Sequence, residues 1–422
     1  MFQECEIPLS ELFDSSDNNL NNPLLLKLNK KRIRSKSGKT YQIIRYDKDL
    51  LSFDLHLKLG FFRSLVLDLD DKKVVAMAPV KSLTYDSDSF KTIDFSDIQI
   101  QEFVEGTMIN MFWDNNKNDW EIATRSTIGG KVKFYQDKEN LTFKEMFDEA
   151  VKHCNVKDDF SKLDKKLMYS FVLQHPSNRI VTPFKDPALY LIDVYSFDTS
   201  NDKLKIVNYN VQSSEPTEKE KEIFDILIKN NKINVPKIYN EFKNIDDCIA
   251  LYKQGNMPYD DVGVVFKHLK SNARSKFRNP IYEEVRQLKG NYPKKQYRYL
   301  ALRKCGKMRE YLNIFTEDRK DFYKYREMCH NFTRRLFNFY VSCYMKKQKE
   351  LKYFPFEYRS HMISLHKLYV YKLKPEGDFI RRNHVIDYFN LLHPSQQMFA
   401  LNFNMRKLNI DTLKNDVETK TS

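Results

Sequence analysis

Residues 102–114 read Glu-Phe-Val-Glu-Gly-Thr-Met-Ile-Asn-Met-Phe-Trp-Asp, and they decide how the rest of this 422-residue chain is interpreted. The acid-glycine pair Glu105-Gly106 stands between two runs of β-branched and apolar residues, 98–103 and 107–113. Runs of this composition predict strands. Glycine is rare in the chain, with 10 of 422 residues, so a glycine between two strands indicates a need of the backbone there. The stretch therefore predicts a sheet with a special backbone position at Gly106.

Outward from this stretch, the chain alternates predicted strands with a few predicted helices. Strands are predicted over 63–70, 74–80, 98–103, 107–113, 120–125, 132–135, 167–173, 179–183, 189–194, 204–211 and 262–269. Helices are predicted over 141–156, 217–229 and 245–253, the first with Thr142 and Glu145 as a capping box. After Pro280 apolar and aromatic residues recur at helical spacing. The pattern predicts an α+β fold with mixed sheets, followed by an all-α region.

The charge of the chain is unevenly distributed. The net charge is +14, and residues 291–360 contain 18 Lys or Arg against 7 Asp or Glu. Such an excess indicates an acidic partner, with nucleic acid as the first candidate, and a solvated helical surface is the alternative. The predicted parts of the chain are an N-terminal extension over 1–50, a sheet-rich domain over 51–290, a basic helical domain over 291–410 and a polar tail over 411–422.

The composition argues against several classes of protein. The six cysteines form no Cys-x-x-Cys pair, which argues against a zinc ribbon or a redox motif. The first residues contain early acids and no apolar run, so we expect no signal peptide and reduced thiols. The chain has no uncharged apolar stretch of about 18 residues, so no membrane span is expected. These features predict a cytoplasmic protein.

The order of the segments resembles that of the phage-type RNA ligases, the family of the tRNA-repairing ligase of T-even bacteriophages. The resemblance covers most of residues 50–290, and a helical C-terminal domain follows in that family too. It rests on local matches at 62–66, 78–83, 105–107, 122–127, 171–181, 263–265 and 276–278. The most specific match is 171–181, Phe-Val-Leu-Gln-His-Pro-Ser-Asn-Arg-Ile-Val. The family also has an aromatic-rich strand there, followed by Pro, Thr or Ser, Asn, Arg, Ile and Val.

The resemblance implies a nucleotidyltransferase fold, as in DNA and RNA ligases and similar to ATP-grasp proteins, with mixed antiparallel sheets before an all-α basic C-terminal domain. It implies a lysine that attacks the α-phosphate of ATP, and ATP and Mg²⁺ as cofactors if the protein is active. Glu105, Lys276 and Arg278 are implied in catalysis. The residues implied in nucleotide binding are Arg63, Lys81, Glu105, Gly106, Arg125, Arg179, Lys276 and Arg278. Lys276 and Arg278 alternate on one strand, so their side chains should face the same way.

The chain departs from the family pattern at three positions. Phe103 stands where the family has its nucleophilic lysine, Val172 where it has a ribose-binding glutamate, and Val262 where it has a metal-associated glutamate. Asp260 and Asp261 are close to the third position, but a shift of one residue turns a strand side chain to the other face. We therefore predict a catalytically degenerate protein and assign no metal ligands. Similar lysine-less Val-Glu-Gly-Thr-Met-Ile sequences of large DNA viruses of eukaryotes point to a viral source, and hence to the host cytoplasm.

Two alternative activities stay open. A displaced lysine would make the protein an active ATP-dependent RNA ligase in RNA repair, because burial or neighbouring cations can activate an amine. The candidate lysines are Lys81, Lys131, Lys133 and Lys276. A capping-type guanylyltransferase is the weaker alternative, because it needs the same lysine and an oligonucleotide-binding domain where this chain is predicted helical. Glu105 either orients a metal-bound water or a ribose, or is a structural carboxylate that accepts backbone N–H bonds near Gly106.

The basic helical domain suits RNA, whether tRNA or another structured RNA. Its cations can contact phosphates, and interleaved aromatic residues can stack on unpaired bases. Aromatic residues at helical spacing are also common in cores, so the cations are the firmer prediction. The residues predicted to contact RNA are Arg334, Arg335, Lys346 and Lys347. His175 and His330 have no partner at metal-ligand spacing and are interpreted as core or surface histidines.

Overall fold

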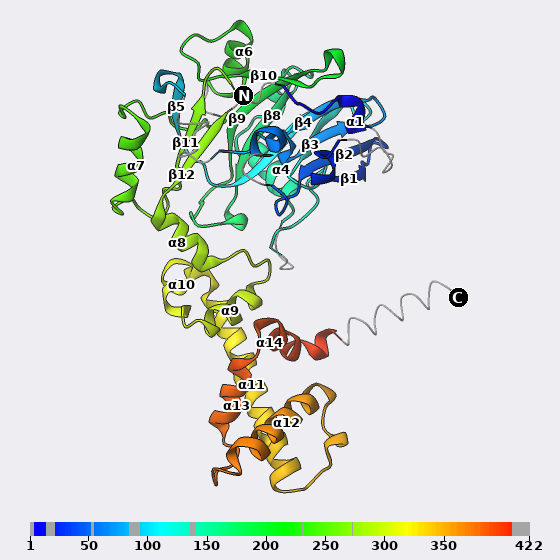
Figure 1. The fold of residues 1–422 in the computed structure, drawn as a ribbon, viewed down its shortest axis with the longest axis vertical. Coiled ribbons are helices and arrows are strands. Elements are labelled where there is room, and N and C mark those ends of the chain that lie inside the picture. The colour runs from blue at the N-terminus through cyan, green and yellow to red at the C-terminus, as the bar shows by residue number, and fades with distance from the viewer. Residues whose placement is uncertain are drawn as a thin grey trace, which may run out of the picture. The chain divides into compact units, whose positions relative to one another are not determined.

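The computed structural model describes residues 4–13, 22–51, 55–83, 93–135, 141–229, 232–271 and 273–406. The chain divides into two compact units, Met1–Gln287 and Leu288–Ser422 (Figure 1). The sheets belong to the first unit, and the regular elements of the described part of the second unit are helical. The fold is therefore α+β with antiparallel sheets, as predicted. The tail predicted over 411–422 lies outside the described residues.

The first sheet contains the strands nearest the N-terminus. Its strands, in spatial and sequence order, are β1 (Leu28–Arg34), β2 (Thr40–Tyr46), β3 (Leu65–Asp68) and β4 (Lys73–Met77). All neighbours are antiparallel. Two short helices belong to the same part of the chain, α1 (Leu9–Phe13) and α2 (His56–Leu59). Residues 28–46 fall in the predicted extension, and they pair directly with β3 through β2.

The second sheet is antiparallel and has the order β10-β9-β8-β6-β7. Its strands are β6 (Thr107–Asp114), β7 (Asp119–Ala123), β8 (Met168–Gln174), β9 (Ala188–Asp198) and β10 (Lys205–Tyr209). In sequence, α4 (Phe143–His153) and α5 (Lys157–Phe160) lie between β7 and β8, and α6 (Glu218–Leu227) follows β10. Apolar residues of α4 and α6 share one core with β6, β8 and β9. The predicted capping box of Thr142 and Glu145 begins α4.

The third sheet brings distant parts of the chain together. Its order is β12 (Arg274–Arg278), β11 (Gly263–His268) and β5 (Ile98–Glu102), all antiparallel. Helix α7 (Ile245–Lys253) precedes β11 in sequence and has the predicted bounds. Since β5 ends at Glu102 and β6 begins at Thr107, the four residues between them connect the third sheet to the second. Residues 102–114 therefore cross from the third sheet to the second.

Three strand predictions are corrected by the structure. Residues 132–135 form no strand, because the chain turns away after β7 through Gly129 and Gly130, which have φ values of 77° and 60°. Residues 179–183 form no strand either, because the N–H groups of Val181 and Thr182 donate to the Glu105 carboxylate instead of a neighbouring strand. The strand predicted from 63 begins at Leu65, and Arg63 ends a 3₁₀ turn, Gly60–Arg63.

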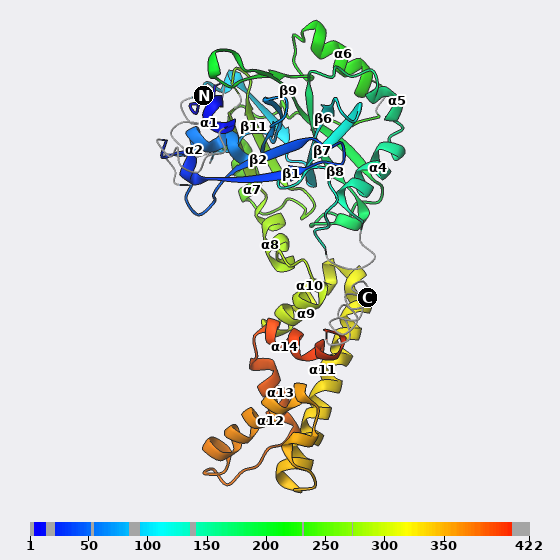
Figure 2. The same ribbon diagram turned by 90° about the vertical axis from the view of Figure 1, so that its right-hand side faces the viewer.

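The second unit is built from helices with an aromatic core. Its helices are α9 (Lys295–Lys304), α10 (Met308–Ile314), α11 (Arg319–Tyr340), α12 (Phe356–Leu368), α13 (Arg382–Leu391) and α14 (Pro394–Leu401), and α8 (Pro280–Lys289) leads into it. The rings of Tyr311, Phe315 and Phe322 stack within the core. α11 and α12 lie side by side (Figure 2). No described helix combines the length and the apolar character that crossing a membrane requires.

Candidate phosphate-binding pocket

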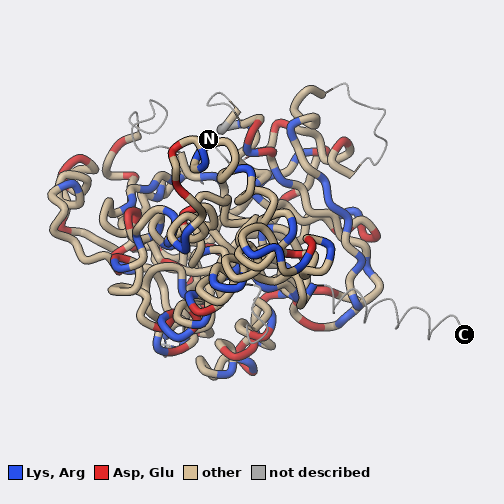
Figure 3. Tube along the Cα trace, turned by 90° about the horizontal axis from the view of Figure 1, so that it is seen from below, with Lys and Arg blue, Asp and Glu red and all other residues tan. Residues whose placement is uncertain are grey.

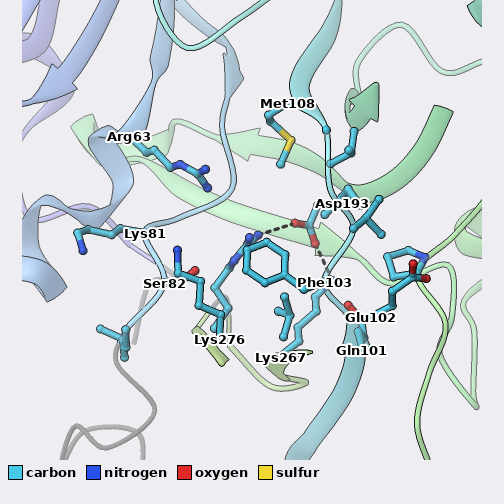
Figure 4. A pocket seen from close by; sticks show the side chains of 18 of the residues that line it. Arg63, Lys81, Ser82, Gln101, Glu102, Phe103, Met108, Asp193, Lys267 and Lys276 are labelled. Carbon is cyan, nitrogen blue, oxygen red and sulfur yellow. Dashed lines mark hydrogen bonds and ion pairs between the residues drawn. The ribbon is translucent and has the colours of Figure 1, made fainter. Parts of the chain in front are cut away.

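A pocket of about 700 Å³ lies between the second and third sheets and is rich in cations (Figure 4). The basic residues that line it are Lys48, Arg63, Lys81, Arg125, Lys267, Arg274, Lys276 and Arg278. The acidic residues among the described lining are Glu102 and Asp193. Strands β5, β6, β8, β9, β11 and β12 all contribute, so residues far apart in the sequence meet at one site.

Phe103 occupies the centre of this pocket, in the connection between β5 and β6. Its backbone N–H donates to the carbonyl of Gly263 at 3.0 Å, which fixes the segment against β11. The Lys276 ammonium lies 5.8 Å and the Arg278 guanidinium 5.5 Å from the centroid of its ring. Both distances are in the range of cation–π contacts. An aromatic ring therefore stands next to two cations where the resemblance implies an amine.

Lys276 lies on β12 in a strongly positive environment. Burial first, and then the neighbouring cations Arg278, Arg63, Arg274 and Lys81, lower its pKa to about 7. Lys276 and Arg278 approach the same ring from alternate positions of one strand, as predicted. An anion between them would relieve the repulsion that depresses the pKa.

Arg63 and Lys81 extend the positive surface on the side of the first sheet. Burial lowers the pKa of Arg63 to about 10, and the neighbouring Arg274 contributes to the effect. Burial and the charge of Arg63 lower the pKa of Lys81. The Arg63 guanidinium donates to the Pro79 carbonyl at 3.4 Å. A carbonyl is neutral, so this hydrogen bond does not neutralise the positive charge of Arg63.

Part of the positive charge is balanced inside the pocket. Asp193 is 5% exposed, and its carboxylate lies 2.6 Å from the Lys267 ammonium and 3.6 Å from the Arg274 guanidinium. Arg278 has an ion pair with Glu283 at 3.3 Å, which Glu283 shares with Arg286. Lys267, Arg274 and Arg278 thus have carboxylate partners. Lys276 has no ion pair with a carboxylate of the described residues. The pocket is suited to a ligand that carries several negative charges.

The Glu105 carboxylate is buried and forms hydrogen bonds with backbone N–H groups. The side chain is 5% exposed and is not among the residues that line the pocket. Its carboxylate accepts the Val181 N–H at 2.9 Å, the Thr182 N–H at 3.1 Å and the Thr182 hydroxyl at 3.2 Å. These contacts favour the second of its two interpretations, a carboxylate that holds the backbone. In this structure the Glu105 carboxylate holds residues 181–182, and its predicted catalytic role stays a prediction.

Gly106 explains why the chain uses a glycine at this point. Its φ is 150°, and a Cβ would lie 2.5 Å from the Leu173 carbonyl oxygen and 2.6 Å from a methyl group of Val172. Only glycine fits both the conformation and the space. Gly106 also lines the pocket.

The remaining predicted pocket residues divide into two groups. Arg125 lines the pocket and is exposed to solvent. Arg179 is not among the lining residues, and its Nε donates to the Val181 carbonyl at 2.8 Å. Of the candidate displaced lysines, Lys81 and Lys276 line the pocket, whereas Lys131 and Lys133 are exposed outside it.

Valines occupy the two positions at which the resemblance implies acids. Val172 is buried and lines the pocket, and Val262 is buried beside Asp261. The Asp261 carboxylate accepts the Gly263 N–H at 2.9 Å and the Tyr252 hydroxyl at 3.2 Å, and burial raises its pKa. The described residues contain no group of three or more side chains that could hold a metal ion. Mg²⁺ at a nucleotide site usually needs only one or two carboxylates besides phosphates and water, and the carboxylates of the described lining are Glu102 and Asp193.

Sequence reasoning missed the basic residue Arg274 and the ion pair beside it. Arg274, Lys276 and Arg278 recur with a period of two, so they face one side of a strand, and this signal was available. Lys267 is the partner of Arg274 in the ladder of β11 and β12. Asp193 gave no local signal, because β9 comes to the pocket only through the pairing of β8 and β9.

The predicted RNA contacts of the second unit are exposed. Arg334 and Arg335 lie on α11, and Lys346 and Lys347 follow the π-helical turn η8 (Val341–Met345). Arg334 donates to the Asn331 side chain at 2.8 Å. Exposure makes all four available to a partner. The aromatic rings of Tyr311 and Tyr340, in contrast, are buried in the helical core.

Comparisons with known proteins place the chain near RNA ligases. No protein-family model matches it. It is 22% identical over 217 residues to an RNA ligase of Rhodothermus phage RM378, which is 46% of this chain and 46% of the relative. The chain thus matches about half the length of that curated relative.

Solved structures similar to this chain are also ligases. An archaeal ATP-dependent RNA ligase is 11% identical, with a TM-score of 0.43, over 70% of this chain and 69% of that one. A mutant of Naegleria gruberi RNA ligase, solved with ATP and Mn, is 12% identical, with a TM-score of 0.32, over 45% of this chain and 51% of that one. The similarity in sequence is to the phage RNA ligase and covers 46% of this chain.

Proposed function

We propose that this chain is an RNA ligase-like protein of the nucleotidyltransferase fold that binds the phosphates of a nucleotide or an RNA end and has lost the covalent step. The observation that carries the proposal is the ring of Phe103 beside the cations Lys276 and Arg278. A phenyl ring cannot attack a phosphorus atom, but the cations around it can bind phosphate oxygens.

The pocket supports phosphate binding through charge and burial. A cation that has been desolvated without a counter-ion costs free energy, and an anionic ligand offsets that cost. Arginine also contacts two phosphate oxygens at once, which makes the interaction geometrically specific. Arg63, Lys81 and Lys276 all have lowered pKa values from burial and mutual repulsion, which is the signature of such a site.

A second candidate function rests on Lys276 as a displaced nucleophile. A lysine with a pKa of about 7 is about half neutral at neutral pH, and only the neutral amine is nucleophilic. Its amine would form the bond to the α-phosphorus of ATP while the α–β P–O bond breaks, pyrophosphate leaves and the proton passes to solvent. Attack requires in-line placement at about 3–3.5 Å from the phosphorus. This would be an active ATP-dependent RNA ligase, whereas a guanylyltransferase would use GTP by the same chemistry.

RNA is the proposed partner of the second unit, in line with the RNA ligases to which the chain is similar. Arg334, Arg335, Lys346 and Lys347 are the proposed phosphate contacts. Lys and Arg occur along most of the chain with Asp and Glu between them (Figure 3). The overall charge therefore does not locate an RNA-binding surface, and the proposal relies on local clusters of exposed cations.

Incubation with α-labelled ATP, and separately GTP, tests the proposal. The protein is mixed with label and Mg²⁺ or Mn²⁺ and separated on a denaturing gel, and its affinity for unlabelled ATP is measured by calorimetry. The proposal expects ATP binding and no covalent label. A label that disappears in Lys276→Ala would establish the second candidate. Unchanged ATP affinity in both Lys276→Ala and Arg278→Ala would contradict the pocket as the phosphate site.

A further inference from the structure

A second hollow lies in the helical unit, beside the π-helical turn η8 that continues α11. It has a volume of about 840 Å³ and is lined by Cys343, Tyr344, Lys347, Gln348, Lys349, Glu350, Leu351 and Tyr353. We call it the η8 hollow. π-Helical turns are rare and are frequent at functional sites. The turn lies between α11 and the loop that leads to α12. Most residues that line the hollow are exposed, so the hollow is open to solvent.

Two tyrosines of the η8 hollow offer aromatic faces of different kinds. Tyr344 is half-buried, and its ring stacks on the imidazole of His366 with 4.0 Å between centroids and 11° between planes. Burial lowers the pKa of His366, which favours the neutral ring in this stack. Tyr353 is 67% exposed, and the Lys352 ammonium lies 5.1 Å from the centroid of its ring. The hollow thus combines a ring that is fixed by its neighbour with a ring that solvent and ligands can reach.

Two lysines of the same hollow supply positive charge. Lys347 and Lys349 are exposed, and the nearby carboxylate of Glu350 is engaged by Lys352 at 2.7 Å. Lys347 has a φ of 50°, a conformation that residues other than glycine adopt rarely. The N–H of the next residue, Gln348, donates to the Ser342 carbonyl at 2.8 Å, which closes the helix at this point. A lysine therefore stands where glycine would be the usual residue, and its charge borders the hollow.

We propose that the η8 hollow binds an unpaired nucleotide of single-stranded RNA. The base stacks on Tyr353 and Tyr344, and Lys347 and Lys349 contact the flanking phosphates. This inference rests on the proposed binding of RNA by the second unit and adds to it a site for unpaired bases. Aromatic faces together with cations are the chemistry by which single strands are bound without sequence preference. An acidic peptide would use the lysines but would gain little from two ring faces.

Fluorescence anisotropy with labelled oligouridine and a labelled RNA duplex tests this site in the full chain. Tyr353→Ala should weaken oligouridine binding by roughly tenfold, within the range known for one stacked base, and should change duplex binding little. Tyr353→Phe should restore oligouridine binding, because it keeps the ring. Tyr323→Ala is the matched control, since Tyr323 is 64% exposed on α11 and lies outside the hollow. The control should bind like the unaltered protein.

Lys347→Gly tests the charge of Lys347 without disturbing the backbone at this position. Glycine accepts a φ of 50° readily, so the helix end should be preserved while the cation is lost. Oligouridine binding should weaken, and the slope of log affinity against log salt should fall by about 0.7. Lys324→Ala, an exposed lysine of α11 outside the hollow, should change binding less.

The outcomes distinguish this inference from the function on which it rests. Oligouridine affinity that is equal in the unaltered protein and in Tyr353→Ala would overturn the stacking site alone. Equal loss on oligouridine and duplex would show that Tyr353 does not read unpaired bases, which also overturns it. Absence of binding of either RNA by the unaltered protein would overturn both the site and the proposed RNA partner.

Discussion

Lys276 should make the phosphate affinity of the pocket depend on pH. Its pKa is lowered to about 7, so the protonated fraction falls as the pH rises from about 6 to about 8. A neutral amine loses a charge-assisted hydrogen bond, so pyrophosphate affinity should fall by about tenfold across this interval. Bound phosphate should raise the pKa again, so that binding takes up protons. Calorimetry in buffers of different ionisation enthalpy measures both effects.

Lys276→Met provides the reference for this prediction, because pyrophosphate itself titrates in the same interval. The variant should bind more weakly and should show only the pH dependence of the ligand. Parallel pH profiles of the unaltered protein and the variant would contradict the role given to Lys276.

Glu105 should matter for stability rather than for ligand binding. Its carboxylate accepts hydrogen bonds from three donor groups of residues 181 and 182, and Glu105 does not line the pocket. Glu105→Gln should lower the free energy of unfolding by about 2 kcal/mol, because buried donors lose a charged acceptor. Urea unfolding measures this change, and pyrophosphate affinity should stay within about twofold. If Glu105→Gln is as stable as the unaltered protein but no longer binds pyrophosphate, Glu105 contributes to ligand binding and this prediction is wrong.

At the scale of elements, Gly106 should be indispensable for joining the third sheet to the second. Gly106→Ala places a Cβ 2.5 Å from the Leu173 carbonyl oxygen at a φ of 150°, so β6 and β8 would have to move apart. We expect a loss of about 3 kcal/mol or more in the free energy of unfolding. Gly255→Ala is the matched control, because its φ is 72° but nothing lies within 4 Å of the added Cβ. It should cost about 1 kcal/mol.

The elements also separate what the sequence can predict from what it cannot. α7 and the cap of α4 follow from local chemistry, and the period of two places Lys276 and Arg278 on one face of β12. The strand predicted over 179–183 failed because a carboxylate 76 residues earlier takes its N–H groups. Asp193 was missed because its strand reaches the pocket only through sheet pairing. Local composition therefore predicts elements, while contacts between distant segments decide the site.

For the whole molecule, RNA binding and phosphate binding should be separable. Reversing the charge of Arg334 and Arg335 to Glu should weaken RNA binding by more than about tenfold at moderate salt and reduce its salt slope by about 1 to 2. Both residues are exposed on α11, so the fold should persist. Anisotropy over a salt series measures the slope, and pyrophosphate affinity in the same variant is the control. Unaltered RNA affinity and slope would argue against α11 as a phosphate contact.

Phe103 also bears on the evolutionary history of the chain. A lysine at this position would set another ammonium beside Lys276 and Arg278, which flank the ring of Phe103. The valines at 172 and 262 would not supply the acids that the resemblance implies at those positions. Under the proposed function, the single change would therefore add repulsion from two cations without supplying those acids. Under the proposed function, regaining the covalent step would thus need several changes at once, whereas single changes could still alter the phosphate affinity of the pocket.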